Sequence, residues 1–65
     1  MTTYTLYWIS EDGQSDIRMG AFNTRLDAWG STLKAELEMI DQAADQEQRD
    51  SIVAGWWTVC ENKEN

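Results

Sequence analysis

Acidic side chains at helical spacing are the residues of this chain that most clearly carry chemistry. Glu38, Asp41 and Asp45 follow one another at intervals of three and four, and side chains at these intervals lie about 5–6 Å apart on a helix. Asp27 extends the row toward the N-terminus, and Lys34 interrupts it. Together with two acids farther along the chain, the predicted acidic face consists of Asp27, Glu38, Asp41, Asp45, Glu47 and Asp50.

Such a row matches the phosphates of a nucleic-acid strand in spacing and sign, and a basic protein groove binds those phosphates mainly through charge. One interpretation is therefore a protein that occupies a nucleic-acid-binding channel. The alternative is a solvated helix face without a partner. A secondary acidic cluster favours the first interpretation modestly, and it consists of Glu11, Asp12 and Asp16.

The net charge points to the same class of partner. Twelve acids against five bases give a formal charge of −7, which repels nucleic acid and anionic membranes and favours basic proteins. We therefore expect no direct binding to nucleic acid or membrane. Solubility alone is the competing explanation, because a net charge of about two to eight is usual for a small soluble domain.

Catalytic and metal-binding equipment is sparse. Histidine is absent, which removes the usual general base near neutral pH and the commonest zinc ligand. Asp12-Gly13 lacks the acid spacing of a calcium-binding loop. The lone Cys60 follows apolar residues, so we expect a buried, unreactive thiol in a cytoplasmic protein. The sequence predicts no enzyme activity, no metal and no cofactor.

One long helix, from about residue 24 to 46, is predicted to carry most of the acidic face. Its apolar residues recur every three or four positions, the period of one helix face. Thr24 and Asp27 fit a capping box at its start. We expect the apolar stripe to face the core, and its six residues are Leu26, Trp29, Leu33, Leu37, Ile40 and Ala44.

Three strands are predicted to accompany this helix, at about residues 3–10, 16–22 and 56–61, from their β-branched and aromatic content. Asp12-Gly13 favours a tight turn between the first two. The segment 45–50 reads as a helix end passing into a loop, with a short helical turn before Gly55 as the alternative. The order is a small ββαβ domain of the α+β class, spanning residues 1–61 with a three-stranded, mostly antiparallel sheet and a flexible tail at 62–65.

The two faces of the predicted sheet both carry apolar residues. We expect the third strand to lie beside the first, and the face with Leu6 and Trp8 to meet Leu33, Leu37 and Ile40 of the helix. The other face then has no second layer. An exposed aromatic patch of that kind normally marks an interface, here for a homodimer or another partner, unless these residues form the core instead. Its residues are Tyr7, Ile9 and Trp56.

In its small size, acidity and lack of catalytic residues the chain resembles small phage and mobile-element inhibitors of host defence. The resemblance is closest to anti-CRISPR proteins and DNA-mimicking anti-restriction proteins, and it rests on the acidic face over a β-β-α-β frame. Members of this class typically bind a basic surface of a CRISPR effector complex and keep target DNA out. The resemblance implies that the acidic face contacts lysines and arginines of such a complex in the host bacterial cytosol.

A structural or interaction module is the rival prediction. In that case two copies, or a small subunit and its partner, assemble through Tyr7, Ile9 and Trp56, and the charge serves solubility. Salt separates the two possibilities, because binding driven by charge weakens steeply as ionic strength rises.

Overall fold

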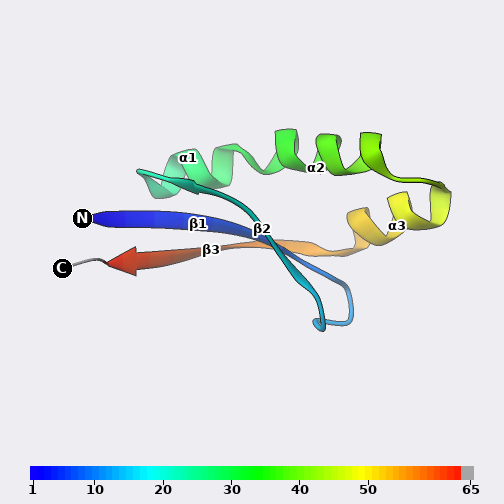
Figure 1. Cartoon of the computed structure of the whole chain (residues 1–65), viewed down its shortest axis with the longest axis horizontal. Helices are drawn as coiled ribbons and strands as arrows, with labels where there is room; N and C mark the ends of the chain where they lie inside the picture. Colours follow the sequence, from blue (N-terminus) through cyan, green and yellow to red (C-terminus); the bar gives the residue numbers. More distant parts are fainter. Residues whose placement is uncertain (64–65) are drawn as a thin grey trace.

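A computed structural model describes residues 1–63 of the chain as a three-stranded sheet with helices on one face (Figure 1). The order of its elements in the described chain is β1 (Thr2–Ile9), β2 (Asp16–Phe22), α1 (Arg25–Gly30), α2 (Thr32–Gln42), α3 (Gln46–Ala54) and β3 (Trp56–Lys63). The sheet order is β2-β1-β3, and both pairs are antiparallel. The predicted α+β class is therefore confirmed, as is the placement of the third strand beside the first.

The β1–β2 connection is closed by short polar contacts rather than by a two-residue hairpin. The Ser10 amide donates to the Ser15 carbonyl oxygen at 2.9 Å, and the Gly13 amide donates to the Ser10 carbonyl oxygen, also at 2.9 Å. Gly13 has φ of 74°, a conformation that glycine adopts without the steric penalty of a Cβ. The predicted turn at Asp12-Gly13 is thus present within a longer loop.

The core lies between the central strand and α1. Leu6 and Ala28 are fully buried, and Trp8 is 7% exposed. The Trp8 Nε1–H donates to the Ile52 carbonyl oxygen of α3 at 3.1 Å, so the strand face with Leu6 and Trp8 is the face that meets the helices. This part of the predicted core is confirmed.

The predicted helix from 24 to 46 is present as one bent helix over residues 25–42, and a separate helix follows it. Helices α1 and α2 form one bent helix with its junction at Ser31, and α2 ends at Gln42 because Ala43 is extended. Asp45 then starts α3, its side chain accepting the Gln48 amide at 2.9 Å, while the Gln48 side chain accepts the Ala44 amide. The first bond is an N-cap contact, and the second satisfies the amide just before the cap. Together they start a helix where a loop, or a short helical turn before Gly55, was predicted.

The orientation of the apolar stripe was predicted wrongly. Leu26 is 81% exposed, Trp29 44%, Leu33 64% and Leu37 57%; Ile40 is half-buried and Ala44 exposed. The bent helix instead packs the small side chain of Ala28 against the sheet. Because the sheet already presents the bulky Leu6 and Trp8, small side chains opposite them allow the helix to approach closely.

The end of the chain also differs from the prediction. β3 continues to Lys63, with Thr2 opposite Lys63 and Thr3 opposite Asn62. The Asn62 side-chain amide donates to the Thr5 hydroxyl at 2.8 Å, which helps to bury Thr5 on the sheet face away from the helices. Residues 62 and 63 therefore belong to the sheet, and 64–65, also predicted to be a flexible tail, lie outside the described residues.

Candidate functional site

Most carboxylates gather in one half of the molecule. The β1–β2 turn, α2 and α3 lie in the half away from the N-terminal end of β1 and the C-terminal end of β3 (Figure 1). These segments, with the first residue of β2 and the N-cap residue of α3, contain nine of the twelve acidic residues, against the bases Lys34 and Arg49. We name this region the acidic half, and its acids are Glu11, Asp12, Asp16, Glu36, Glu38, Asp41, Asp45, Glu47 and Asp50.

The charges of the acidic half are not neutralised from within the described chain. No lysine or arginine side chain of residues 1–63 forms an ion pair with these carboxylates. All of them except Glu36 are exposed. Charges that are exposed and unpaired remain available to a partner of opposite sign.

Three of these carboxylates accept hydrogen bonds from neighbouring residues. Asp45 caps α3, and Asp50 accepts the Gln46 side-chain amide at 2.8 Å. Asp12 accepts the Ser10 hydroxyl at 2.6 Å and the Gln14 amide at 3.0 Å. Glu38, Asp41 and Glu47 make no such bonds within residues 1–63, so they are the freest of the predicted contact residues.

The Asp12 contacts lower the pKa of its carboxyl below the ordinary value of 3.8, chiefly through the Ser10 hydroxyl and secondarily through the Gln14 amide. A lowered folded-state pKa means that the stabilisation of the turn is fully present above about pH 4 and is lost as pH falls through the folded pKa. We expect a carboxyl-carbon NMR titration of Asp12 to show a midpoint below 3.8, and Ser10→Ala to raise it. A midpoint at or above that value would contradict the contact.

The predicted acidic face is divided by the fold. Glu38 and Asp41 line a shallow hollow on α2 together with the base Lys34 and with Gly30, Leu33 and Leu37. Beyond the helix end, Asp45 and Glu47 line a different hollow with Trp8 and Ile17. The straight ladder from Glu38 to Asp45 is therefore interrupted at Ala43.

Tertiary structure brings two acids of the secondary cluster, Glu11 and Asp12, near the second of these groups. Glu11 and Asp12 share a hollow with Trp8 and Ser51, and Ser51 also lines the hollow of Asp45 and Glu47. The turn and α3 therefore present one acidic region. This arrangement has no local sequence signal, because about 40 residues separate the two segments.

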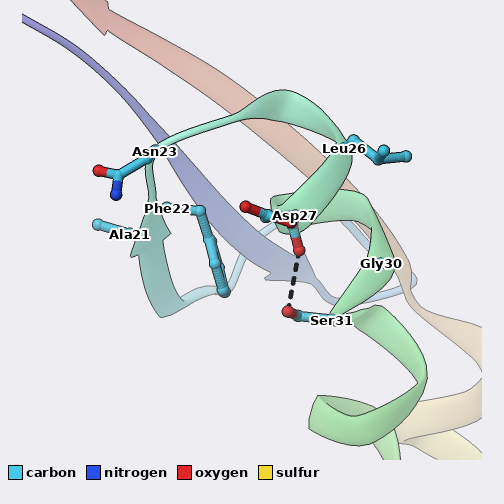
Figure 2. Close-up of a pocket in the computed structure, with 7 residues that line it drawn as sticks. All are labelled: Ala21, Phe22, Asn23, Leu26, Asp27, Gly30 and Ser31. Atoms are coloured by element: carbon cyan, nitrogen blue, oxygen red, sulfur yellow. Dashed lines mark hydrogen bonds between the residues drawn. The ribbon is translucent and has the colours of Figure 1, made fainter.

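Asp27 stands apart from the acidic half. It lies in α1, beside an open hollow between that helix and the end of β2, lined by Ala21, Phe22, Asn23, Leu26, Asp27, Gly30 and Ser31 (Figure 2). The Asp27 amide donates to the Thr24 hydroxyl at 3.1 Å, which is the threonine half of the predicted capping box. The Ser31 hydroxyl donates to the Asp27 carbonyl oxygen at 2.9 Å, and the Leu26 side chain points away from Phe22 (Figure 2).

The aromatic patch predicted on the sheet lies on the face opposite the helices. Ile9 pairs with Trp56 and Tyr7 with Thr58 across β1 and β3. Trp56 is 48% exposed, whereas Tyr7 and Ile9 are half-buried. Cys60, expected to be buried, is exposed on the same face opposite Thr5.

The exposed part of the apolar stripe is the surface that sequence reasoning missed. We name Leu26, Trp29, Leu33 and Leu37 the outer stripe. The spacing of three and four shows that these residues share one face of the helix, but it does not show whether that face meets the sheet or solvent. The available signal was the row of small residues on the opposite side of the same helix, Ala28 and Ala35, which suits close packing on a sheet of large side chains.

Metal-binding clusters and helices able to cross a membrane are both absent from residues 1–63. No three His, Cys, Asp or Glu side chains there come together in a way that could hold a metal ion. None of the helices in this part of the chain is both long and apolar enough to cross a bilayer. Comparison with protein-family models, curated proteins and solved structures finds no match to this chain.

Proposed function

We propose that this chain is an inhibitor that binds a basic, nucleic-acid-binding surface of a host defence complex through its acidic half. The observation that supports this function is the concentration of nine acids and two bases in the turn, α2 and α3, with no ion pair to a described lysine or arginine. The resemblance to anti-CRISPR and DNA-mimicking proteins makes a CRISPR effector complex the first partner to test. In this proposal the bound inhibitor prevents the effector complex from recognising its target DNA.

The magnitude of the charge supports mimicry of one strand rather than of a duplex. The acidic half carries an excess of seven acids over about half of the 43 Å length of the molecule, which is about one charge per 3 Å. A single strand carries one phosphate per about 3.4 Å, and a duplex one per about 1.7 Å. The acidic half therefore suits a groove that holds a single strand.

Charge reversal on α2 tests this function. We expect Glu38→Lys with Asp41→Lys to weaken binding to an effector complex by about tenfold or more per reversed contact, about 1.4 kcal/mol each, because attraction becomes repulsion. Neither side chain has a hydrogen bond within residues 1–63, so the fold should persist. Asp45→Lys is avoided because it removes the α3 cap.

The measurement is competition with single-stranded target DNA for purified effector complexes, between low and moderate salt. Glu61→Lys is the control for a single reversal, Glu38→Lys, because it makes the same change in β3, outside the acidic half, and removes only a long contact with the Tyr4 hydroxyl at 3.4 Å. Wild type and the Glu61 variant should inhibit equally and lose affinity steeply as salt rises. Full inhibition by the Glu38/Asp41 double variant would remove the acidic half from the mechanism.

A structural module assembled through the aromatic sheet face is the second candidate. It is favoured by the 48% exposure of Trp56 on the sheet face that no described helix covers (Figure 1). Apolar contacts lose little affinity with salt, and tryptophan is a frequent energetic anchor of interfaces. Capture of a partner that Trp56→Ala abolishes, and that salt leaves unchanged, would support this candidate over the inhibitor.

A further inference from the structure

The single chain exposes more surface than a monomeric domain of its mass. Its accessible area is 4733 Å², against about 4,250 Å² for a folded monomer of 7.5 kDa. The radius of gyration is 12.6 Å, against about 10.7 Å for a compact domain of this length. The excess of about 500 Å² is the size of one side of a small protein interface.

The outer stripe lies along a helical seam. Leu26, Gly30, Leu33, Leu37 and Ile40 follow one another at alternating intervals of four and three, the repeat of a coiled coil. Ser31 retains right-handed helical backbone angles at the bend between α1 and α2, so the seam continues across it. Ala28, on the opposite side of the helix, is the residue buried against the sheet, which leaves the seam facing outward.

We propose that the outer stripe is the interface between two copies of this chain, packed as an antiparallel helix pair about a two-fold axis. Antiparallel packing sets Leu26 of one copy against Leu37 of the second copy, and Gly30 against Leu33. Gly30 has nothing within 4 Å of where its Cβ would lie in the single chain. The open space at Gly30 receives the leucine of the second copy, as a hole receives a knob.

Charge complementarity along the seam fixes the direction of the pair. In the antiparallel arrangement Asp27 lies beside Lys34 of the second copy, and Lys34 lies beside Asp27 of the second copy. Both side chains are without an ion pair in residues 1–63. A parallel pair would instead bring Glu36 against Asp41 of the second copy, and like charges at flanking positions oppose association.

The area is sufficient for a specific dimer. The four side chains of the outer stripe are 44–81% exposed, which is on the order of 400 Å² per copy at roughly 100 Å² each. Two copies therefore cover on the order of 800 Å² with these side chains alone. The flanking Gly30, Lys34 and Asp27 bring the total to the roughly 1,000 Å² at which biological interfaces begin.

The oligomeric state tests the proposal directly. We expect sedimentation equilibrium of the whole chain at tens of micromolar to give twice the mass of 7.5 kDa. Leu33→Glu should raise the dissociation constant by about 100-fold or more, because it places a charge in the centre of the seam. Val53→Glu is the matched control, since Val53 is 61% exposed on α3 and lies outside the seam.

Unfolding of the variant is separated from loss of the dimer by circular dichroism of the diluted proteins. The Leu33 side chain is 64% exposed in the single chain, so the Leu33→Glu spectrum should match that of dissociated wild type. A wild-type chain that is monomeric at these concentrations would overturn the proposal. So would a Leu33→Glu chain that remains dimeric, or a dimer that Trp56→Glu abolishes and Leu33→Glu leaves intact.

A charge swap tests the antiparallel direction. Lys34→Asp should weaken the dimer about tenfold, because two aspartates then meet on each side of the seam. Asp27→Lys should weaken it similarly, with two lysines in contact. The double variant restores opposite charges at both places and should recover most of the affinity. Failure of the double variant to recover affinity, with both single variants impaired, would overturn this pairing.

Discussion

Replacing Trp8 with alanine is expected to leave the chain unfolded at 25 °C. Trp8 is 7% exposed near the C-terminal end of the middle strand, and removing a buried tryptophan side chain costs about 3–5 kcal/mol. A domain of this size seldom has more than about 3–5 kcal/mol of stability. Far-ultraviolet circular dichroism during heating should show no cooperative transition for Trp8→Ala and one for the wild type.

Trp8→Phe separates the indole hydrogen bond from the apolar volume. It keeps an aromatic ring in the core but removes the Nε1–H that donates to the Ile52 carbonyl oxygen at 3.1 Å. We expect this variant to fold with a loss of about 1–3 kcal/mol, from the missing bond and imperfect packing. A melting midpoint equal to wild type for Trp8→Ala would show that β1 does not form the core.

Gly55→Ala has the second largest expected effect. A Cβ at this position would lie 2.5 Å from the Ile9 carbonyl oxygen and 2.6 Å from the Trp8 ring. The carbonyl belongs to the central strand, and the Trp8 ring is held by its bond to Ile52, so neither atom moves cheaply. Overpacking of this kind costs about 1–3 kcal/mol, and displacement of Trp8 weakens the attachment of α3 to the sheet.

Chemical denaturation of the Gly55→Ala chain should therefore give a lower midpoint with an unchanged slope. Gly20→Ala is the matched control, because its Cβ would meet only the Phe22 ring at 3.4 Å, an ordinary contact. We expect the control to stay within about 1 kcal/mol of wild type. Equal midpoints for the two alanine variants would mean that the α3–β3 junction is more open than described.

The strands were predictable because their signals are local. The β-branched and aromatic composition of residues 3–10 and 56–61, and the Asp12-Gly13 pair between the first two strands, each act within a few residues. Assigning Leu6 and Trp8 to one face also followed from the alternation of side chains along a strand. These features predicted the sheet, its order and the face that meets the helices.

The helical layer was only partly predictable. A period of 3.6 identifies residues that share a helix face, but it does not say whether that face meets the sheet or solvent. Leu33 and Leu37 share a face as predicted, yet the opposite face carries Ala28 into the core. The break at Ala43 has a local signal in the sequence, because Asp45 is a favourable N-cap residue and Gln48 follows it by three positions.

The candidate site was also predictable in part. The acidic residues and their helical spacing were readable from the sequence, and the freest of them, Glu38 and Asp41, are exposed together on α2. The neighbourhood of Glu11 and α3 was not readable, since it depends on how the Trp8 indole anchors α3 to the sheet. Long-range docking of this kind has no counterpart in residue spacing.

The pairing of Thr2 with Lys63 also decides how the molecule can be handled. The start of β1 and the end of β3 lie side by side, away from the turn, α2 and α3 (Figure 1). An affinity tag attached beyond either of them therefore holds the protein by the same end of the molecule. A chain tethered to a bead by either route then presents its acidic half outward. Bait made both ways should capture the same binder, which gives a built-in replicate for any capture experiment.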